Sequence, residues 1–144
     1  MRRADLYLVQ YREAIRRGEI IAGQELITEL DRLIADLDNP RYIYDTRDAW
    51  ERMDFMQGCI KLTKSPFYGK PMTLMLWQKA FIEVVYSFKM ADSGFDRFKR
   101  IVLLIARKNT KSETCSALAL TEAICGAMGA DIVCSSNDDN QASI

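Results

Sequence analysis

An apolar run that gives way to a short basic loop is the feature that most constrains how this chain folds. Residues 99–105 are rich in β-forming side chains, residues 107–112 read Arg-Lys-Asn-Thr-Lys-Ser, and residues 112–127 favour a helix. The pattern predicts a buried strand, a polar loop and a helix in that order. This arrangement suits phosphate binding, because the helix dipole and the backbone N–H groups of its first turn attract anions.

The loop matches part of the standard phosphate-binding motif, GxxxxGK[ST]. On that frame, Lys111 takes the place of the lysine that reaches the β/γ-phosphates, and Ser112 that of the Mg²⁺ ligand. Ile105 and Thr110 stand where the motif has glycine. A β-branched residue such as Thr110 resists positive φ and adds bulk near a ligand. A solvated basic turn between strand and helix would show the same residues, so both interpretations stay open.

Local charge favours an anion at this loop, although the whole chain is balanced. The full sequence has 20 basic and 20 acidic residues, so its net charge does not indicate a nucleic-acid or membrane partner. Residues 97–112, in contrast, contain basic side chains and no acid. The basic residues are Arg97, Lys99, Arg100, Arg107, Lys108 and Lys111.

Apolar residues at helical spacing predict four helices before the loop. The first stops near Gly18, the second covers about 26–37, the third about 45–60 and the fourth about 76–88. Proline after Asn39 ends the second helix. We therefore interpret residues 1–95 as a helical lead-in.

Residues 96–144 are expected to begin a different architecture. The strand at 99–105, the helix at 112–127 and a second apolar strand at 132–134 form a βαβ unit, whose strands are parallel. The predicted fold class is α/β: a P-loop NTPase fragment with a helical lead-in and one βαβ unit of a parallel sheet. Because two strands do not complete such a sheet, we expect a truncated front part of a larger domain.

Composition excludes several classes of protein. The four cysteines form no CxxC pair and the chain has no histidine, so zinc binding is not indicated and we expect buried, reduced thiols in a cytosolic protein. The cysteines are Cys59, Cys115, Cys125 and Cys134. No apolar run approaches the roughly 18 residues of a membrane span, so we expect no membrane partner.

The loop and several other segments resemble one family. Residues 107–112 resemble the variant Walker A loop of tailed-phage terminase large subunits, Arg-Lys-Asn-Gly-Lys-Ser/Thr. Residues 74–78 are similar to that family's L-x-x-W-Q segment. Residues 11–15 look like its N-terminal opening, and residues 42–45 like its Tyr-x-Phe-Asp segment. Residues 138–142 resemble the Asp-Gln-Ala stretch after the second strand. The matches keep the family's order along nearly the whole chain.

The resemblance implies ATP and Mg²⁺ as cofactors of a DNA-packaging motor that also cuts DNA. It implies that Lys111 contacts the β/γ-phosphates, that Ser112 holds Mg²⁺, and that Arg107 stabilises transition-state charge. Segment 71–79 would lie on the adenine side, with Gln78 pairing with the base edge and Trp77 stacking nearby. A core tryptophan and an ordinary exposed amide are the alternatives for these two residues. The implied nucleotide-binding residues are Trp77, Gln78, Arg107, Lys108, Asn109, Thr110, Lys111 and Ser112.

The same resemblance implies the partners of the intact family protein. These are double-stranded viral DNA, the terminase small subunit, the portal protein of the procapsid and further copies of the large subunit. The implied location is the cytoplasm of the bacterial host.

Two features of the intact motor are missing from the sequence. No apolar strand ending in Asp-Glu follows the loop, and residues 33–36 (Leu-Ile-Ala-Asp) lie in a helical pattern upstream. No carboxylate cluster for a nuclease follows either. We therefore expect ATP turnover to be very slow or absent. An inactive, truncated prophage remnant and a helicase-like P-loop protein are the alternative interpretations.

Overall fold

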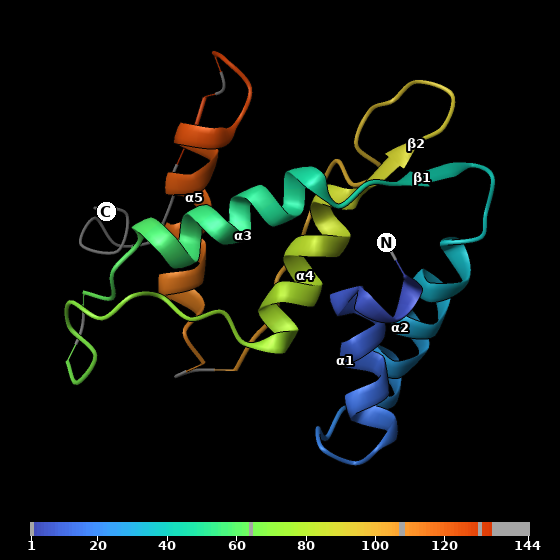
Figure 1. Cartoon of the computed structure of the whole chain (residues 1–144), viewed down its shortest axis with the longest axis horizontal. Helices are drawn as coiled ribbons and strands as arrows, with labels where there is room; N and C mark the ends of the chain where they lie inside the picture. The colour runs from blue at the N-terminus through green and yellow to red at the C-terminus, as the bar shows by residue number, and fades with distance from the viewer. Residues whose placement is uncertain (1, 64, 107–108, 130, 134–144) are drawn as a thin grey trace. The chain divides into compact units, whose positions relative to one another are not determined.

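The computed structural model describes residues 2–63, 65–106, 109–129 and 131–133. Figure 1 shows its elements. In chain order they are the 3-10 helix η1 (Arg3–Asp5), helices α1 (Tyr7–Arg16) and α2 (Gln24–Asp36), strand β1 (Tyr42–Tyr44), helices α3 (Arg47–Cys59) and α4 (Leu76–Ser87), strand β2 (Phe88–Met90) and helix α5 (Lys111–Cys125). The chain thus combines helices with a small sheet and is α/β in the broad sense.

The helices predicted from apolar spacing are confirmed, with α1 to α5 at the expected places. The end of α1 shows why local sequence suffices. Gly18 adopts φ +75°, its N–H donates to the Ile15 carbonyl over 3.0 Å, and the Glu19 N–H donates to the Ala14 carbonyl over 3.0 Å. This is a Schellman motif, which satisfies the last carbonyls of a helix and favours glycine at the residue with positive φ.

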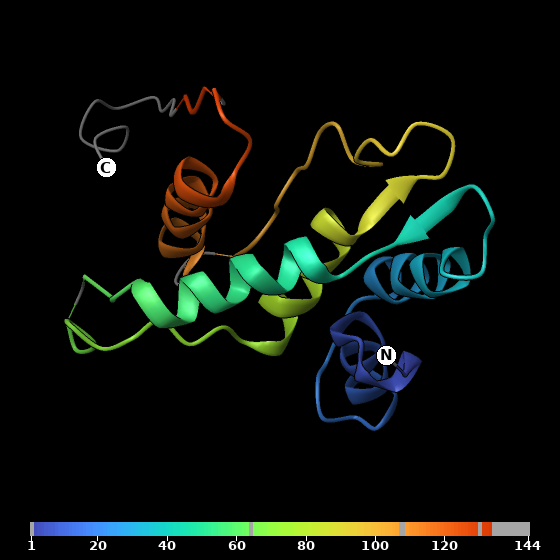
Figure 2. The ribbon, with the colours of Figure 1, turned by 45° about the horizontal axis from the view of Figure 1, so that its top comes forward.

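The sheet differs from the one predicted. Strands β1 and β2 are antiparallel, with Tyr42 opposite Met90 and Tyr44 opposite Phe88, and Figure 2 shows their arrows running in opposite directions. Both strands lie in the region predicted as a helical lead-in. Among the described residues this two-stranded sheet is the only one, and it contains no parallel pair.

The predicted βαβ unit is therefore not shown, and the reason is a lack of strand partners. Residues 99–105 form no strand, although α5 follows them as expected. Val102 and Leu104 are 91% and 96% exposed. A strand exists only through hydrogen bonds to a neighbouring strand, so apolar sequence alone does not make one. Ile132 and Val133 also form no strand, and Cys134 lies outside the described residues.

The chain divides into two compact units. The first comprises the described residues within 1–53 and 73–102, and the second those within 54–72 and 103–144. The first unit holds η1, α1, α2, β1, α4 and β2, and the second holds α5. Helix α3 begins in the first unit and ends in the second.

The core of the first unit forms where α1 packs against α2 and α4. Four buried side chains define this core: Leu8, Leu30, Leu33 and Phe88. Phe88, on β2, has no exposed surface, and its ring packs edge-on against Tyr44 with centroids 4.6 Å apart. Burial of these side chains stabilises the unit by roughly 1.5–3 kcal/mol for each fully buried large residue.

Two expectations from composition can be compared with the structure. The prediction of buried thiols is wrong for Cys59 and Cys115, which are exposed, and Cys125 is half-buried. Cys59 is the last residue of α3, and Cys115 follows the buried Thr114 on α5, so it turns onto another face of the helix. Within the described part of the chain, every helix is too short or too polar to cross a membrane.

Candidate nucleotide-binding site

The loop before α5 has an unusual backbone conformation at Thr110. This residue adopts φ 55° and ψ 22°, in the left-handed region, and is the N-cap residue of α5. It is the one non-glycine residue with positive φ in the described part of the chain. Left-handed backbone costs a residue with a Cβ roughly 1–2 kcal/mol, and a β-branched side chain such as threonine rarely adopts it. The sequence has Thr110 where a P-loop has glycine, and the structure gives it the backbone of glycine.

Thr114, in the first turn of α5, donates two hydrogen bonds to the Thr110 carbonyl. Its backbone N–H donates to the Thr110 carbonyl over 2.9 Å, and its Oγ1 donates to the same carbonyl over 2.8 Å. Thr114 has no exposed surface. The Thr110 hydroxyl donates to the Asn109 carbonyl over 2.8 Å and forms no side-chain cap to the helix. The two threonine side chains therefore bond to backbone carbonyls of the loop, at Asn109 and at Thr110.

Asn109, Lys111 and Ser112 are exposed beside this turn. Lys111 is the first residue of α5 and Ser112 the second, so both stand at the end of the helix that attracts anions. Lys111 could provide an ammonium group to a phosphate, and Ser112 a hydroxyl to a metal ion. Glu113, also in the first turn, places an acidic group that opposes an anion there. Arg107 and Lys108 lie outside the described residues, so their roles stay predictions.

Trp77 and Gln78 lie in the first turn of α4, in the other unit. Gln78 is 2% exposed, and its Oε1 accepts a hydrogen bond of 2.7 Å from the Met75 N–H. The interpretation of Gln78 as an ordinary exposed amide is therefore wrong, because its side chain caps α4. Trp77 is half-buried. A joint site of α4 with the loop before α5 stays a prediction.

A buried carboxylate in the first unit was not anticipated from the sequence. Glu83 of α4 has no exposed surface and accepts three hydrogen bonds. Its Oε1 accepts from the Leu8 N–H over 3.0 Å and from the Tyr44 hydroxyl over 3.1 Å. Its Oε2 accepts from Trp50 Nε1 over 3.1 Å. One side chain thus links α4 to α1, β1 and α3.

The three hydrogen-bond partners of the buried Glu83 carboxylate are neutral donors. Burial, and then the adjacent Glu83 charge, raise the pKa of Tyr44 above its ordinary value, so Tyr44 remains a protonated donor. The signal that could have revealed Glu83 is its position as a lone acid among Phe81, Ile82, Val84 and Val85. Acids in such apolar surroundings are seldom buried unless hydrogen-bonded.

The Arg97 side chain makes its contacts within the first unit. Its side chain is 10% exposed, and its Nη2 contacts Asp36 Oδ2 at 2.6 Å. Its guanidinium lies 3.9 Å from the ring centroid of Tyr42 and 4.8 Å from that of Phe88. Burial opposes ionisation of Asp36, but hydrogen bonds from Arg97 and Asn39 outweigh it and lower the Asp36 pKa. The basic stretch 97–112 therefore offers one charge fewer to an anion than its sequence suggests.

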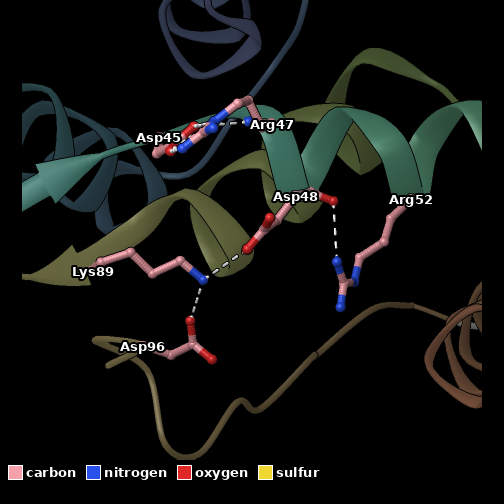
Figure 3. Close-up of polar contacts among 6 residues, drawn as sticks. All are labelled: Asp45, Arg47, Asp48, Arg52, Lys89 and Asp96. Carbon is pink, nitrogen blue, oxygen red and sulfur yellow. Dashed lines mark hydrogen bonds and ion pairs between the residues drawn. The ribbon is translucent and has the colours of Figure 1, made fainter. Parts of the chain in front are cut away.

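Lys89 of β2 is likewise neutralised within the unit (Figure 3). Its Nζ donates to Asp48 Oδ2 over 3.1 Å and to Asp96 Oδ1. Burial opposes the Lys89 charge, but the two carboxylates outweigh it and raise the pKa. Beside it, Arg47 pairs with Asp45 at the start of α3. Lys89 is therefore held by two carboxylates, whereas Lys111 at the start of α5 is exposed.

No protein-family model, curated protein or solved structure matches this chain. In the described part, no group of three or more Cys, His, Asp or Glu side chains is placed to hold a metal ion. The functional assignment therefore depends on the loop before α5 and on the ordered sequence segments.

Proposed function

We propose that this chain is the N-terminal portion of a phage DNA-packaging terminase large subunit and that it binds ATP with Mg²⁺ at residues 107–112. One observation carries the proposal. Thr110 takes the left-handed conformation directly before Lys111 at the start of α5, where a P-loop has glycine. Strained backbone of this kind clusters at ligand-binding sites, and observing it is a reason to suspect one.

We also propose the finer fold, a P-loop core whose first strand includes residues 101–105. The exposure of Val102 and Leu104 supports it, because such apolar side chains are stabilised only when a sheet and its covering helices bury them. In this proposal, further strands pair with residues 101–105 in the intact protein.

Each site residue has a proposed role. Lys111 contacts the β/γ-phosphates, Ser112 provides one Mg²⁺ ligand, and Arg107 stabilises the charge that develops during phosphoryl transfer. Trp77 lies on the adenine side, and Gln78 beside it would reach the base edge only by giving up its hydrogen bond with the Met75 N–H. In the intact protein, hydrolysis moves double-stranded DNA, with the small subunit, the portal protein and further copies of the large subunit as partners in the bacterial cytoplasm.

The remnant hypothesis predicts no productive step after nucleotide binding. The exposure of Val102 and Leu104 supports the remnant hypothesis as well as the motor hypothesis. A chain whose strand has no neighbouring strands does not position a water molecule to attack the phosphate. Both hypotheses expect this chain to bind ATP weakly and to release phosphate very slowly. An enzyme-like rate of phosphate release that is lost on Lys111→Ala would exclude the remnant, and it would also contradict the slow turnover expected of a chain in which no strand ending in Asp-Glu follows the loop.

Calorimetric titration of the full chain with ATP and Mg²⁺ tests the site itself. Lys111→Ala should weaken binding by about tenfold or more, because a hydrogen bond to a charged group is worth roughly 1.5–3 kcal/mol. Lys99→Ala is the matched control: it removes another exposed lysine of the same basic stretch and should leave affinity unchanged. Equal affinity of wild type and Lys111→Ala would refute a P-loop here.

A further inference from the structure

Residues 61–63 and 65–71, the described part of the loop between α3 and α4, lie on the surface and form several backbone hydrogen bonds. The loop is the green segment after α3 in Figure 1. Lys61 and Pro71 form an antiparallel bridge at its base. The Leu62 N–H donates to the Lys70 carbonyl over 2.9 Å, and the Gly69 N–H donates to the Leu62 carbonyl over 2.8 Å. The two ends of this loop, which spans residues 61–71, are thus joined to each other by backbone hydrogen bonds.

The tip is a turn that presents two aromatic rings. The Lys70 N–H donates to the Phe67 carbonyl over 3.0 Å, and Gly69 has φ +77°. Positive φ at the third residue is typical of a type II turn and favours glycine there. Phe67 and Tyr68, the first two residues of the turn, are 54% and 77% exposed. Two adjacent rings are thus held in solvent by a hydrogen-bonded turn.

The surroundings of these rings are positively charged. Residues 61–71, the sequence of this loop, contain no acid. Lys61 and Lys70 are exposed, and Lys70 Nζ lies 5.5 Å from the ring centroid of Phe67. A positive charge therefore stands next to an exposed ring face, with no carboxylate of the segment to neutralise it.

Phe95 provides an internal comparison. It is 67% exposed, and Lys99 Nζ lies 5.1 Å from its ring centroid, so its ring and charge are arranged similarly. Asp92 lies three residues before it and would repel a phosphate, whereas Asp96 is paired with Lys89. The loop 61–71 therefore differs from Phe95 in its charge surroundings.

We propose that the loop 61–71 binds single-stranded nucleic acid. Bases stack on Tyr68 and Phe67, while Lys61 and Lys70 contact the phosphates on either side. Exposed rings next to lysines suit a single strand, because its bases have free faces, whereas those of a duplex are already stacked. A membrane surface fits less well, since two rings on a short turn bury little apolar area. The proposal is independent of nucleotide binding at Lys111.

Fluorescence anisotropy of a labelled oligothymidylate of about 15 nucleotides, titrated with the full chain at low salt, tests this proposal. Tyr68→Ala should weaken binding by about tenfold, since one stacked base contributes roughly that much or more. Tyr68→Phe keeps the ring and should bind as wild type does. Phe95→Ala, the matched control, should also leave affinity unchanged.

Salt dependence separates the lysines from the rings. Lys70→Ala should reduce the slope of log affinity against log salt by about 0.7, the value for one phosphate contact on a single strand. Tyr68→Ala should leave that slope unchanged. Lys111→Ala should not affect oligothymidylate binding, so failure of the ATP site leaves this result interpretable.

Three results would overturn the proposal. The first is an oligothymidylate affinity for Tyr68→Ala within about twofold of wild type, less than one stacked base contributes. The second is equal or tighter binding of a duplex of the same length with the same sensitivity to Tyr68→Ala. The third is capture by anionic phospholipid vesicles that requires Tyr68 while oligothymidylate does not bind; this would assign the loop to a membrane surface. Far-UV circular dichroism of each variant confirms that the fold is intact.

Discussion

Similar apolar side chains are buried in the first unit and exposed in the segment 101–106. In the first unit, Phe88 and Leu8 have no exposed surface, and even the carboxylate of Glu83 has three hydrogen-bond donors. In the segment, Val102 and Leu104 are almost fully exposed. The difference arises from the availability of partners. Helices α1, α2 and α4 supply one another's apolar faces, whereas residues 101–106 have no neighbouring strand in the described part of the chain.

The comparison shows that apolar content does not by itself produce a core. A helix satisfies its backbone internally and needs a partner only for one face, but a strand needs a neighbour for its backbone as well. The first unit should therefore respond strongly to substitution, and the segment weakly.

The largest effect is expected at Glu83. Glu83→Ala leaves one buried and two part-buried donors without their acceptor, and the loss at a buried donor costs roughly 1–3 kcal/mol. We expect the free energy of unfolding to fall by about 4 kcal/mol. Urea denaturation monitored by tryptophan fluorescence measures it, and both tryptophans, Trp50 and Trp77, lie in this unit.

Two variants define the cause at Glu83. Glu83→Gln keeps an acceptor for the Leu8 N–H and the Tyr44 hydroxyl but turns an N–H group toward Trp50. Its free energy of unfolding should therefore lie between those of wild type and Glu83→Ala. Glu51→Ala removes an exposed acid of α3 and should change little. A Glu83→Ala protein as stable as wild type would show that the buried carboxylate does not hold the unit together.

A matched pair of leucines measures the comparison directly. Leu33 is 6% exposed in the core of the first unit, and Leu104 is 96% exposed. Leu33→Ala should destabilise the protein by about 3 kcal/mol through lost burial and the cavity left behind. Leu104→Ala should change stability by less than about 0.5 kcal/mol. Differential scanning calorimetry of both variants tests this, and equal losses would mean that Leu104 is buried in solution.

A smaller effect is expected at Thr110, which lies at the proposed phosphate site. Thr110→Gly removes the strain of φ 55° and the side chain beside the proposed phosphate site. Because the unliganded loop already has φ 55°, relief of this strain should stabilise the fold by about 1 kcal/mol, and ATP should bind more tightly only because the side chain no longer stands beside the phosphate. Thr110→Ala keeps the Cβ and should stay near wild type in the same calorimetric titration. Equal affinity of all three proteins would show that the loop tolerates threonine.

The smallest effect concerns acid at the start of α3. A hydrogen bond from the Arg47 side chain, helped by the Arg47 N–H, lowers the pKa of Asp45 to about 2. Because the folded pKa lies below the unfolded one, Asp45 stabilises the fold above about pH 4, and this contribution is lost as pH falls toward about 2.

Asp45 is partly exposed, so solvent screening limits its contribution to less than about 1 kcal/mol. Asp45→Asn should lower stability by that amount at about pH 6 and by much less near about pH 2. Urea denaturation at the two pH values measures it. A difference between wild type and Asp45→Asn that persists unchanged at low pH would assign the stabilisation to something other than the Asp45 charge.

The candidate site was predictable where its determinants are local. The positions of Lys111 and Ser112 at the start of a helix, and the conflict between threonine and positive φ at Thr110, were both expected from the sequence, and both are present in the structure. The burial of Gln78 and the withdrawal of Arg97 from the basic stretch were not expected. The contacts of Arg97 with Asp36 and Tyr42 depend on packing against residues far away in the sequence.

Local sequence is sufficient to specify the five helices and the turn at Gly18, because helix hydrogen bonds and caps involve residues only a few positions apart. Tertiary packing was needed to establish the antiparallel pairing of β1 with β2, the burial of Glu83 and the absence of a strand in the described residues 99–105. Those outcomes depend on which distant segments supply hydrogen-bond partners and apolar contacts. The spacing of apolar residues along the chain does not specify which distant segments these are.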